Sequence, residues 1–126
     1  MKEPSEAQLE ILQVLWEHEP ATVRFVHEKL CETKDVQYTT TLKQIQRMEE
    51  KGMLSAEKSG KSYLYSTKIR ESQVKRSMFN RLVDSTFKGS AMDLVMHALG
   101  QAKPSDDELE ALRKWLEAKK KEENNE

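Results

Sequence analysis

The stretch YTTTLKQIQRMEEKG, residues 38–52, decides the fold, because its spacing is that of one short amphipathic helix. At roughly 100° per residue, Leu42, Ile45 and Met48 fall on one side, with Thr41 at the margin of that side. A helix with one apolar side packs that side against a core and leaves the other side to solvent or to a partner. The residues on the outward side therefore indicate what the helix can do.

The outward side carries cations, an amide and a hydroxyl, and no acid: Thr40, Lys43, Gln44, Arg47 and Lys51. Lysine and arginine neutralise phosphates or bind guanine, glutamine can pair with adenine, and threonine can bond to a base or a phosphate. This composition is typical of a helix that enters the major groove of DNA. Taken alone, a basic side is more often a solvated helix face, so the flanking sequence has to decide.

The ends of this helix are marked as well. Thr39 is expected to cap the first turn. Gly52 directly follows Lys51, which is where a glycine commonly ends a helix. Glu49 and Glu50 fall off the basic side, near the C-terminal end.

The next stretch, residues 53–67, predicts a two-stranded hairpin. Apolar or aromatic residues alternate with polar ones in two runs, Leu54 and Ala56, then Tyr63 and Tyr65. The segment Ser59-Gly60-Lys61 lies between the runs, which puts Lys58 and Lys61 near the tip. A basic helix followed by a basic hairpin is the order of a winged helix-turn-helix domain, in which the third helix enters the major groove and the wing contacts the adjacent backbone.

Two more helices are expected ahead of this pair. Residues 5–8, SEAQ, have the form of a capping box that opens the first helix, and Pro20 ends it. Thr22 is expected to cap a second helix that runs to about Glu32. The residues expected to face the core are Leu9, Ile11, Leu12, Val14, Leu15 and Trp16 in the first helix and Val23, Phe25, Val26 and Leu30 in the second.

Positive charge is concentrated on the predicted helix and wing. The chain has 126 residues and a formal net charge of −1, which fits one small domain or a small domain with an appendage. Residues 1–35 hold four basic and eight acidic side chains, whereas residues 36–70 hold seven basic and three acidic ones. Such a local excess is the electrostatic footprint expected for DNA.

Other classes of function find little support in the sequence. No apolar run approaches the roughly 18 residues that a membrane span needs, and no signal peptide is expected. The single Cys31 cannot form an intramolecular disulfide, so we expect a cytoplasmic protein in which Cys31 is an inert, partly buried residue. The three histidines are scattered and no catalytic, metal or phosphate-loop motif is present, so we expect no enzyme, no metal and no cofactor.

Three further helices are expected after the hairpin, at about residues 70–87, at residues 90–99 and from Ser105 to a charged tail, with a loop over residues 100–104. Such short helices cannot bury their apolar faces against one another alone, so a second copy of the chain is the simplest partner. The alternative is a monomer in which they pack back onto the winged domain. We expect a winged-helix domain over residues 1–68 and a helical dimerisation region over residues 69–126. The residues expected at the dimer interface are Leu94, Val95, Leu109, Leu112, Trp115 and Leu116.

The sequence YTTTLKQIQRMEEKGML with the wing GKSYLYS resembles the penicillinase-repressor family of BlaI, MecI and CopY proteins. The opening SEAQLEILQVLWE and the later GSAMDLVMHAL and SDDELEALRKWLE resemble the same family, so the resemblance runs over nearly the whole chain. It implies a dimeric winged-helix repressor that binds inverted-repeat operators in bacterial promoters. Carried over, the DNA-binding residues are Thr40, Thr41, Lys43, Gln44 and Arg47 in the helix, and Lys58, Ser59, Lys61 and Tyr63 in the wing. We expect Thr39 and Lys51, at the two ends of the helix, to contact DNA as well.

The sequence departs from two branches of this family. The copper-responsive branch has a C-terminal pair of Cys-x-Cys motifs, which this chain lacks. The antibiotic-responsive branch works with a membrane sensor or protease and is inactivated by cleavage of an Asn–Phe bond, where this chain has His97-Ala98. Two other functions stay open, namely a winged-helix module that binds a protein and a repressor of related fold that responds to a small ligand.

Overall fold

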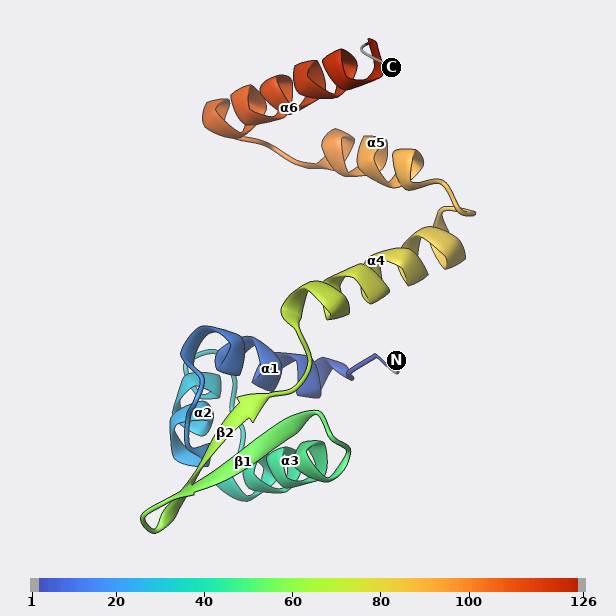
Figure 1. Ribbon diagram of the computed structural model, residues 1–126. Helices are drawn as coiled ribbons and strands as arrows, with labels where there is room; N and C mark the ends of the chain where they lie inside the picture. Colours follow the sequence, from blue (N-terminus) through green and yellow to red (C-terminus); the bar gives the residue numbers. More distant parts are fainter. Residues whose placement is uncertain (1–2, 125–126) are drawn as a thin grey trace. The chain divides into compact units, whose positions relative to one another are not determined.

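The computed structural model describes residues 3–124, which form six α-helices and one antiparallel two-stranded sheet (Figure 1). The chain divides into two compact units, Met1–Leu82 and Val83–Glu126. The predicted class, mainly helical with a winged helix-turn-helix followed by helices, is confirmed. In chain order the elements are α1 (Glu6–His18), α2 (Val23–Leu30), α3 (Tyr38–Glu50), β1 (Leu54–Ser59), β2 (Ser62–Thr67), α4 (Glu71–Thr86), α5 (Ala91–Gln101) and α6 (Asp106–Asn124).

The first two helices begin where the sequence predicts. The Ser5 hydroxyl accepts a hydrogen bond from the Gln8 amide at 3.2 Å, and the Gln8 side chain accepts one from the Ser5 amide at 2.9 Å. This capping box satisfies amides that have no partner inside α1. In the same way, the Thr22 hydroxyl accepts a hydrogen bond from the amide of Phe25 at 3.1 Å, which caps the start of α2. Both starts are therefore determined by local sequence.

The predicted start of α3 is wrong. Its N-cap is Gln37, which makes no side-chain capping bond, and Thr39 already lies in the first turn. The amides of Thr40 and Thr41 donate to the Gln37 carbonyl at 3.0 and 3.2 Å, so the helical bonds begin before Thr39 could cap them. At the other end Gly52 has a φ of +81°, and the amide of Met53 donates to the carbonyl of Met48 at 2.9 Å, as expected for a glycine that ends a helix.

The core of the winged unit joins the three helices to the hairpin. Each buried aliphatic side chain contributes about 1.5–3 kcal/mol to stability. Val26 of α2 and Ile45 of α3 are completely inaccessible, and Trp16 of α1 donates its indole N–H to the Ile69 carbonyl at 3.0 Å. Other members of the core are Ile11, Leu12, Leu15, Val23, Leu30, Met48, Leu54 and Tyr65.

The predicted hairpin is present and is attached to the body of the unit. β1 and β2 pair from Leu54 with Thr67 to Ser59 with Ser62, and Gly60, at a φ of +63°, takes part in the two-residue turn. The backbones of Ala21 and Tyr65 exchange two hydrogen bonds, at 3.0 and 2.8 Å. This bridge ties the wing to the segment between α1 and α2 (Figure 1).

The first part of α4 belongs to the winged unit. Val74 is completely buried, the Ser77 hydroxyl donates to the Glu3 carboxylate at 3.3 Å, and Arg81 forms an ion pair with Glu3 at 3.0 Å. Because of these contacts, the first compact unit includes α4 as far as Leu82. The predicted division at residue 68 follows the end of the wing, whereas the contacts of the chain continue into α4.

The helices α5 and α6 contain no buried residue. Ser90 caps α5, because its hydroxyl accepts a hydrogen bond from the amide of Asp93 at 3.1 Å. Ser105 caps α6 in the same way, with the amide of Glu108 as the donor at 3.1 Å. α5 continues to Gln101, so the loop predicted from Gly100 begins later. Among residues 3–124 no helix combines the length and the apolar character needed to cross a membrane.

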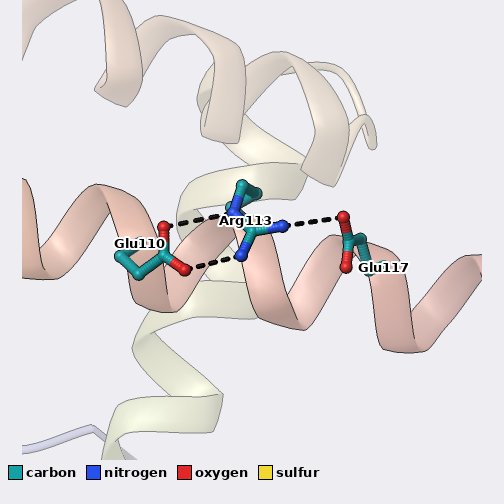
Figure 2. Close-up of polar contacts among 3 residues, drawn as sticks. All are labelled: Glu110, Arg113 and Glu117. Carbon is teal, nitrogen blue, oxygen red and sulfur yellow. Dashed lines mark hydrogen bonds and ion pairs between the residues drawn. The ribbon is translucent and has the colours of Figure 1, made fainter.

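The polar side of α6 is linked by charged side chains. Figure 2 shows Arg113 between two carboxylates, donating to Glu110 at 2.6 Å and to Glu117 at 2.8 Å. The hydrogen bond from Arg113 holds the pKa of Glu110 below its ordinary value. At the start of the helix, hydrogen bonds from the Ser105 backbone and side chain lower the pKa of Glu108. Such pairs stabilise an exposed helix only slightly.

Candidate DNA-binding interface

The orientation of α3 is set by the three side chains that it buries. Thr41, Ile45 and Met48 are at most 2% exposed. At roughly 100° per residue the opposite side is centred on Lys43. The remaining predicted residues of this helix divide into exposed ones, Thr39, Thr40, Lys43, Arg47 and Lys51, and the half-buried Gln44.

Thr41 is not available to DNA, which corrects its predicted role. Its side chain is buried, and its hydroxyl lies 3.1 Å from Nδ1 of His27 on α2. Leu42, Ile45 and Met48 define an apolar side that leaves Thr41 at its margin, which is where the sequence places it. Leu42 is only partly buried, so the whole helix is turned toward Thr41. A polar residue that is buried with a partner holds α2 and α3 together.

The same turn changes the neighbours of the basic side. Gln46 is exposed, and Glu50 joins the outward side one helical turn after Arg47. A carboxylate repels phosphates, so Glu50 weakens the positive potential at the C-terminal end of α3, where Arg47 and Lys51 also lie.

The tip of the wing exposes the residues that the sequence assigned to it. Lys58, Ser59 and Lys61 are exposed around the turn. Tyr63 is 51% exposed, whereas Tyr65, two residues later on the same face of the strand, is 6% exposed. Burial is the largest cause that raises the pKa of Tyr65, and the charge of Glu49 adds to it. The wing therefore leaves the body of the unit between these two tyrosines.

The cations of α3 and of the wing have no acidic partner within the described part of the chain. None of the side chains of Lys43, Arg47, Lys51, Lys58 and Lys61 forms an ion pair in residues 3–124. By contrast, Lys34 is paired with Glu10 and Lys75 with Glu71. Unpaired cations can bind phosphates without first giving up a protein partner.

Sequence reasoning missed two exposed side chains beside this surface. Arg24, on α2, lies with its guanidinium carbon 5.8 Å from the centre of the Tyr38 ring, and both residues are exposed. No pattern within one helix could have shown this, because the two residues come from different helices. Gln46, by contrast, could have been found if Thr41 instead of Leu42 had been counted with Ile45 and Met48 in the apolar side of α3.

Other predicted residues lie as follows. Cys31 is exposed, which corrects its expected partial burial, and its sulfur lies 3.5 Å from Nε2 of His27. Residues 3–124 contain no group of three or more His, Cys, Asp or Glu side chains that could hold a metal ion.

The residues predicted at the dimer interface lie in the second unit. There Val95, Leu109, Trp115 and Leu116 are exposed, while Leu94 and Leu112 are half-buried.

Comparison with known proteins agrees with this geometry. The family model described as penicillinase repressor matches residues 4–118. The methicillin resistance regulatory protein MecI of Staphylococcus aureus (strain N315) is 27% identical over 117 residues, which cover 93% of this chain and 95% of that protein. The transcriptional regulator BlaI of Mycobacterium tuberculosis (strain ATCC 25618 / H37Rv) is 30% identical over 108 residues, 84% of this chain and 77% of that protein.

The solved structures include the DNA-binding domain of the repressor BlaI. It is 31% identical to this chain with a TM-score of 0.50, and the match covers 57% of this chain and 92% of that domain. The family model, these relatives and the winged helix-turn-helix lead to one assignment. This chain belongs to the penicillinase repressor family, as a non-enzymatic DNA-binding transcriptional repressor of the BlaI/MecI type.

Proposed function

We propose that this protein represses transcription as a dimer that binds an inverted-repeat operator, with α3 in the major groove and the wing on the adjacent backbone. The observation that carries the proposal is the set of exposed cations on α3 and the wing that form no ion pair within residues 3–124. Phosphate neutralisation by such cations supplies most of the affinity for a duplex of any sequence.

Within this surface we assign two roles. Thr39, Thr40, Lys43, Gln44 and Arg47 are the residues proposed to reach base edges, because they lie on the outward side of α3 or at its margin. Lys51, at the end of α3, and Lys58, Ser59, Lys61 and Tyr63, in the wing, are proposed to contact the backbone. Backbone contacts fix the register of a protein on the duplex, whereas base contacts select the sequence.

The exposed apolar side chains of the second unit support the dimer. Trp115 is 57% exposed, and Leu109 and Leu116 are each 48% exposed. Exposed apolar patches of this kind are typical of surfaces that bind another protein, and a second copy of the same chain provides an identical patch across a two-fold axis. A dimer would link two α3 helices, and linkage raises the affinity for two adjacent half-sites.

The experiment that tests this function is the capture of fragmented genomic DNA by the full chain, followed by sequencing. We expect enrichment of an inverted repeat whose half-site centres lie about 10–10.5 base pairs apart, or a multiple of that spacing. Enrichment without any inverted repeat would contradict a dimer that acts on two half-sites. A failure to enrich any sequence would favour the module that binds a protein.

The spacing of the half-sites gives a second test. Inserting about five base pairs turns one half-site to the opposite side of the duplex, and inserting about ten restores its side but not its distance. Binding should collapse with the first insertion and recover at most partly with the second. Equal footprints for all three spacings would mean that each subunit binds independently.

Relief of repression by a membrane sensor or protease is a further part of the proposal, and it comes from the family resemblance. His97 and Ala98 lie inside α5 and are exposed. The ring of His97 meets the ring of Phe87 edge-on, with the ring centres 5.9 Å apart. Mass mapping of the chain after exposure of cells to a cell-wall antibiotic would test cleavage at this bond.

A further inference from the structure

A hollow of about 500 Å³ opens among the first residues of α2, the side of α3 and strand β2. Its lining includes two cations, Arg24 and Lys61, and three tyrosines, Tyr38, Tyr63 and Tyr65, and no acid. Another hollow of about 270 Å³ in the same unit is lined by Glu10, Glu17 and Glu32 among others. The absence of acid from the first lining is therefore a property of this place, and it suits an anionic ligand.

Arg24 is held in a defined position at one side of the hollow. Its guanidinium carbon lies 5.8 Å from the centre of the Tyr38 ring, a cation–π distance. The Tyr38 ring in turn meets the ring of His27 edge-on at 5.4 Å, and His27 bonds to the buried Thr41. A chain of contacts thus connects Arg24 to the core face of α3, while no ion pair in residues 3–124 engages its charge.

We propose that this hollow binds the phosphodiester backbone of one DNA strand, with Arg24 and Lys61 as phosphate ligands and Tyr38 as the positioning residue of Arg24. The inference rests on the proposed function, because the hollow lies between the helix and the wing that would contact one duplex. A strand that passes from α3 to the wing has to cross it. The planar fork of arginine fits two phosphate oxygens, and tyrosine and serine hydroxyls can donate to others.

The test measures the affinity of the full chain for the captured operator and for a random duplex at 50 and 200 mM salt. Arg24→Gln should weaken both duplexes by the same factor. One lost phosphate contact lowers the salt slope by about 0.9, so the defect should be roughly 3.5-fold larger at 50 mM than at 200 mM salt. Arg76→Gln is the matched control, because Arg76 is an exposed arginine of α4 outside the hollow and should leave the slope unchanged.

Tyr38 is tested through its coupling to Arg24. Tyr38→Leu removes the ring and should weaken binding in the wild-type background but have little effect in the Arg24→Gln background. Tyr38→Phe keeps the ring and should restore most of the affinity. Equal effects of Tyr38→Leu in both backgrounds would overturn the positioning role. Circular dichroism of each variant separates these effects from a loss of fold.

Two outcomes would overturn the hollow as a backbone site. In the first, the DNA affinity of Arg24→Gln depends on salt in the same way as that of the control Arg76→Gln, while Lys43→Ala and Arg47→Ala still weaken binding. The hollow would then not be a phosphate site, but the proposed function would stand. In the second, Arg24→Gln weakens binding to the operator but not to the random duplex, which makes Arg24 a base contact instead of a backbone contact. If none of these substitutions changes DNA binding, the proposed function itself fails.

Discussion

Leucines spaced for one helical face are buried in α1 and exposed in α6. Leu12 and Leu15 are completely inaccessible, whereas Leu109 and Leu116 are each 48% exposed. In the winged unit, three helices and a hairpin supply apolar faces that close on one another. In the second unit, α5 and α6 contain no buried residue. Periodic spacing identifies the face that needs to be covered, and the number of neighbouring elements decides whether the same chain can cover it.

The difference has an energetic consequence. Short isolated helices are only marginally stable in water, so most of the stability of a helix in a protein comes from packing of its apolar face. The winged unit supplies that packing internally, while α5 and α6 expose the faces that a second copy could cover. Four predictions distinguish these situations or locate their border, and a fifth tests the polar side of α6.

The largest effect is expected from Leu112→Asp in α6. Each of two copies would lose about 1.5–3 kcal/mol of apolar burial, or about 3–6 kcal/mol per dimer, and would gain a charge at the interface. Sedimentation should show a shift to monomer, and operator affinity should fall with it. Lys114→Gln, which makes the same change in charge on an exposed residue nearby, is the control. A wild-type chain that is monomeric at micromolar concentration would refute the interface.

Ile45→Ala should destabilise the winged unit by about 2–5 kcal/mol, because the Ile45 side chain is completely buried and its removal leaves a cavity in the core. Denaturant unfolding followed by circular dichroism measures this change. Gln46→Ala, at the adjacent exposed position, should alter stability by less than about 0.5 kcal/mol. Similar unfolding midpoints for the two variants would show that the phase of α3 is wrong.

The division of roles on α3 and the wing predicts a smaller, qualitative difference. Gln44→Ala should lose discrimination at one base step, worth about 1–3 kcal/mol. Lys61→Ala and Lys58→Ala should weaken all sequences equally and lower the salt slope by roughly one unit each. Titrations with operator and random duplexes measure both quantities. The division fails if every variant lowers the two affinities in the same ratio.

Thr41→Val tests the border between the core and the DNA surface. Removal of the hydroxyl takes away the hydrogen bond between Thr41 and Nδ1 of His27 and should lower stability by about 1 kcal/mol. Operator discrimination should stay unchanged, because Thr41 is only 2% exposed. Thr40→Val, at the exposed neighbouring position, should show the reverse pattern. A loss of base discrimination in Thr41→Val would restore Thr41 to the binding surface.

The smallest effect is expected from Arg113→Gln, which removes both carboxylate contacts shown in Figure 2. The lowered pKa of Glu110 means that the contact stabilises the helix above the ordinary carboxyl pKa. This contribution is lost as the pH falls through the lowered pKa, so the variant and the wild type should converge in acid. Helical circular dichroism at neutral and acidic pH measures the difference. A difference that persists in acid would mean that charge pairing is not its cause.

Much of the fold could be predicted because its signals are local. Ser5, Thr22 and Gly52 mark helix ends through bonds to residues a few positions away, and Gly60 adopts a positive φ in the turn of the hairpin. The cations of the candidate site could also be predicted, since any phase of α3 that buries Ile45 leaves Lys43 and Arg47 exposed. The start of α3 could not, because a polar residue at Thr39 looks like a cap whether or not the helix begins earlier.

The sequence by itself determined the class of this protein, the starts of its first two helices, its hairpin and the location of its positive charge. Local hydrogen bonds and the spacing of apolar residues carry that information. Only the tertiary structure decided that Thr41 faces the core, that Tyr63 is exposed while Tyr65 is buried, and that Arg24 lies against Tyr38. These features depend on how segments that are distant in the sequence pack together, and no periodicity within one segment specifies that packing.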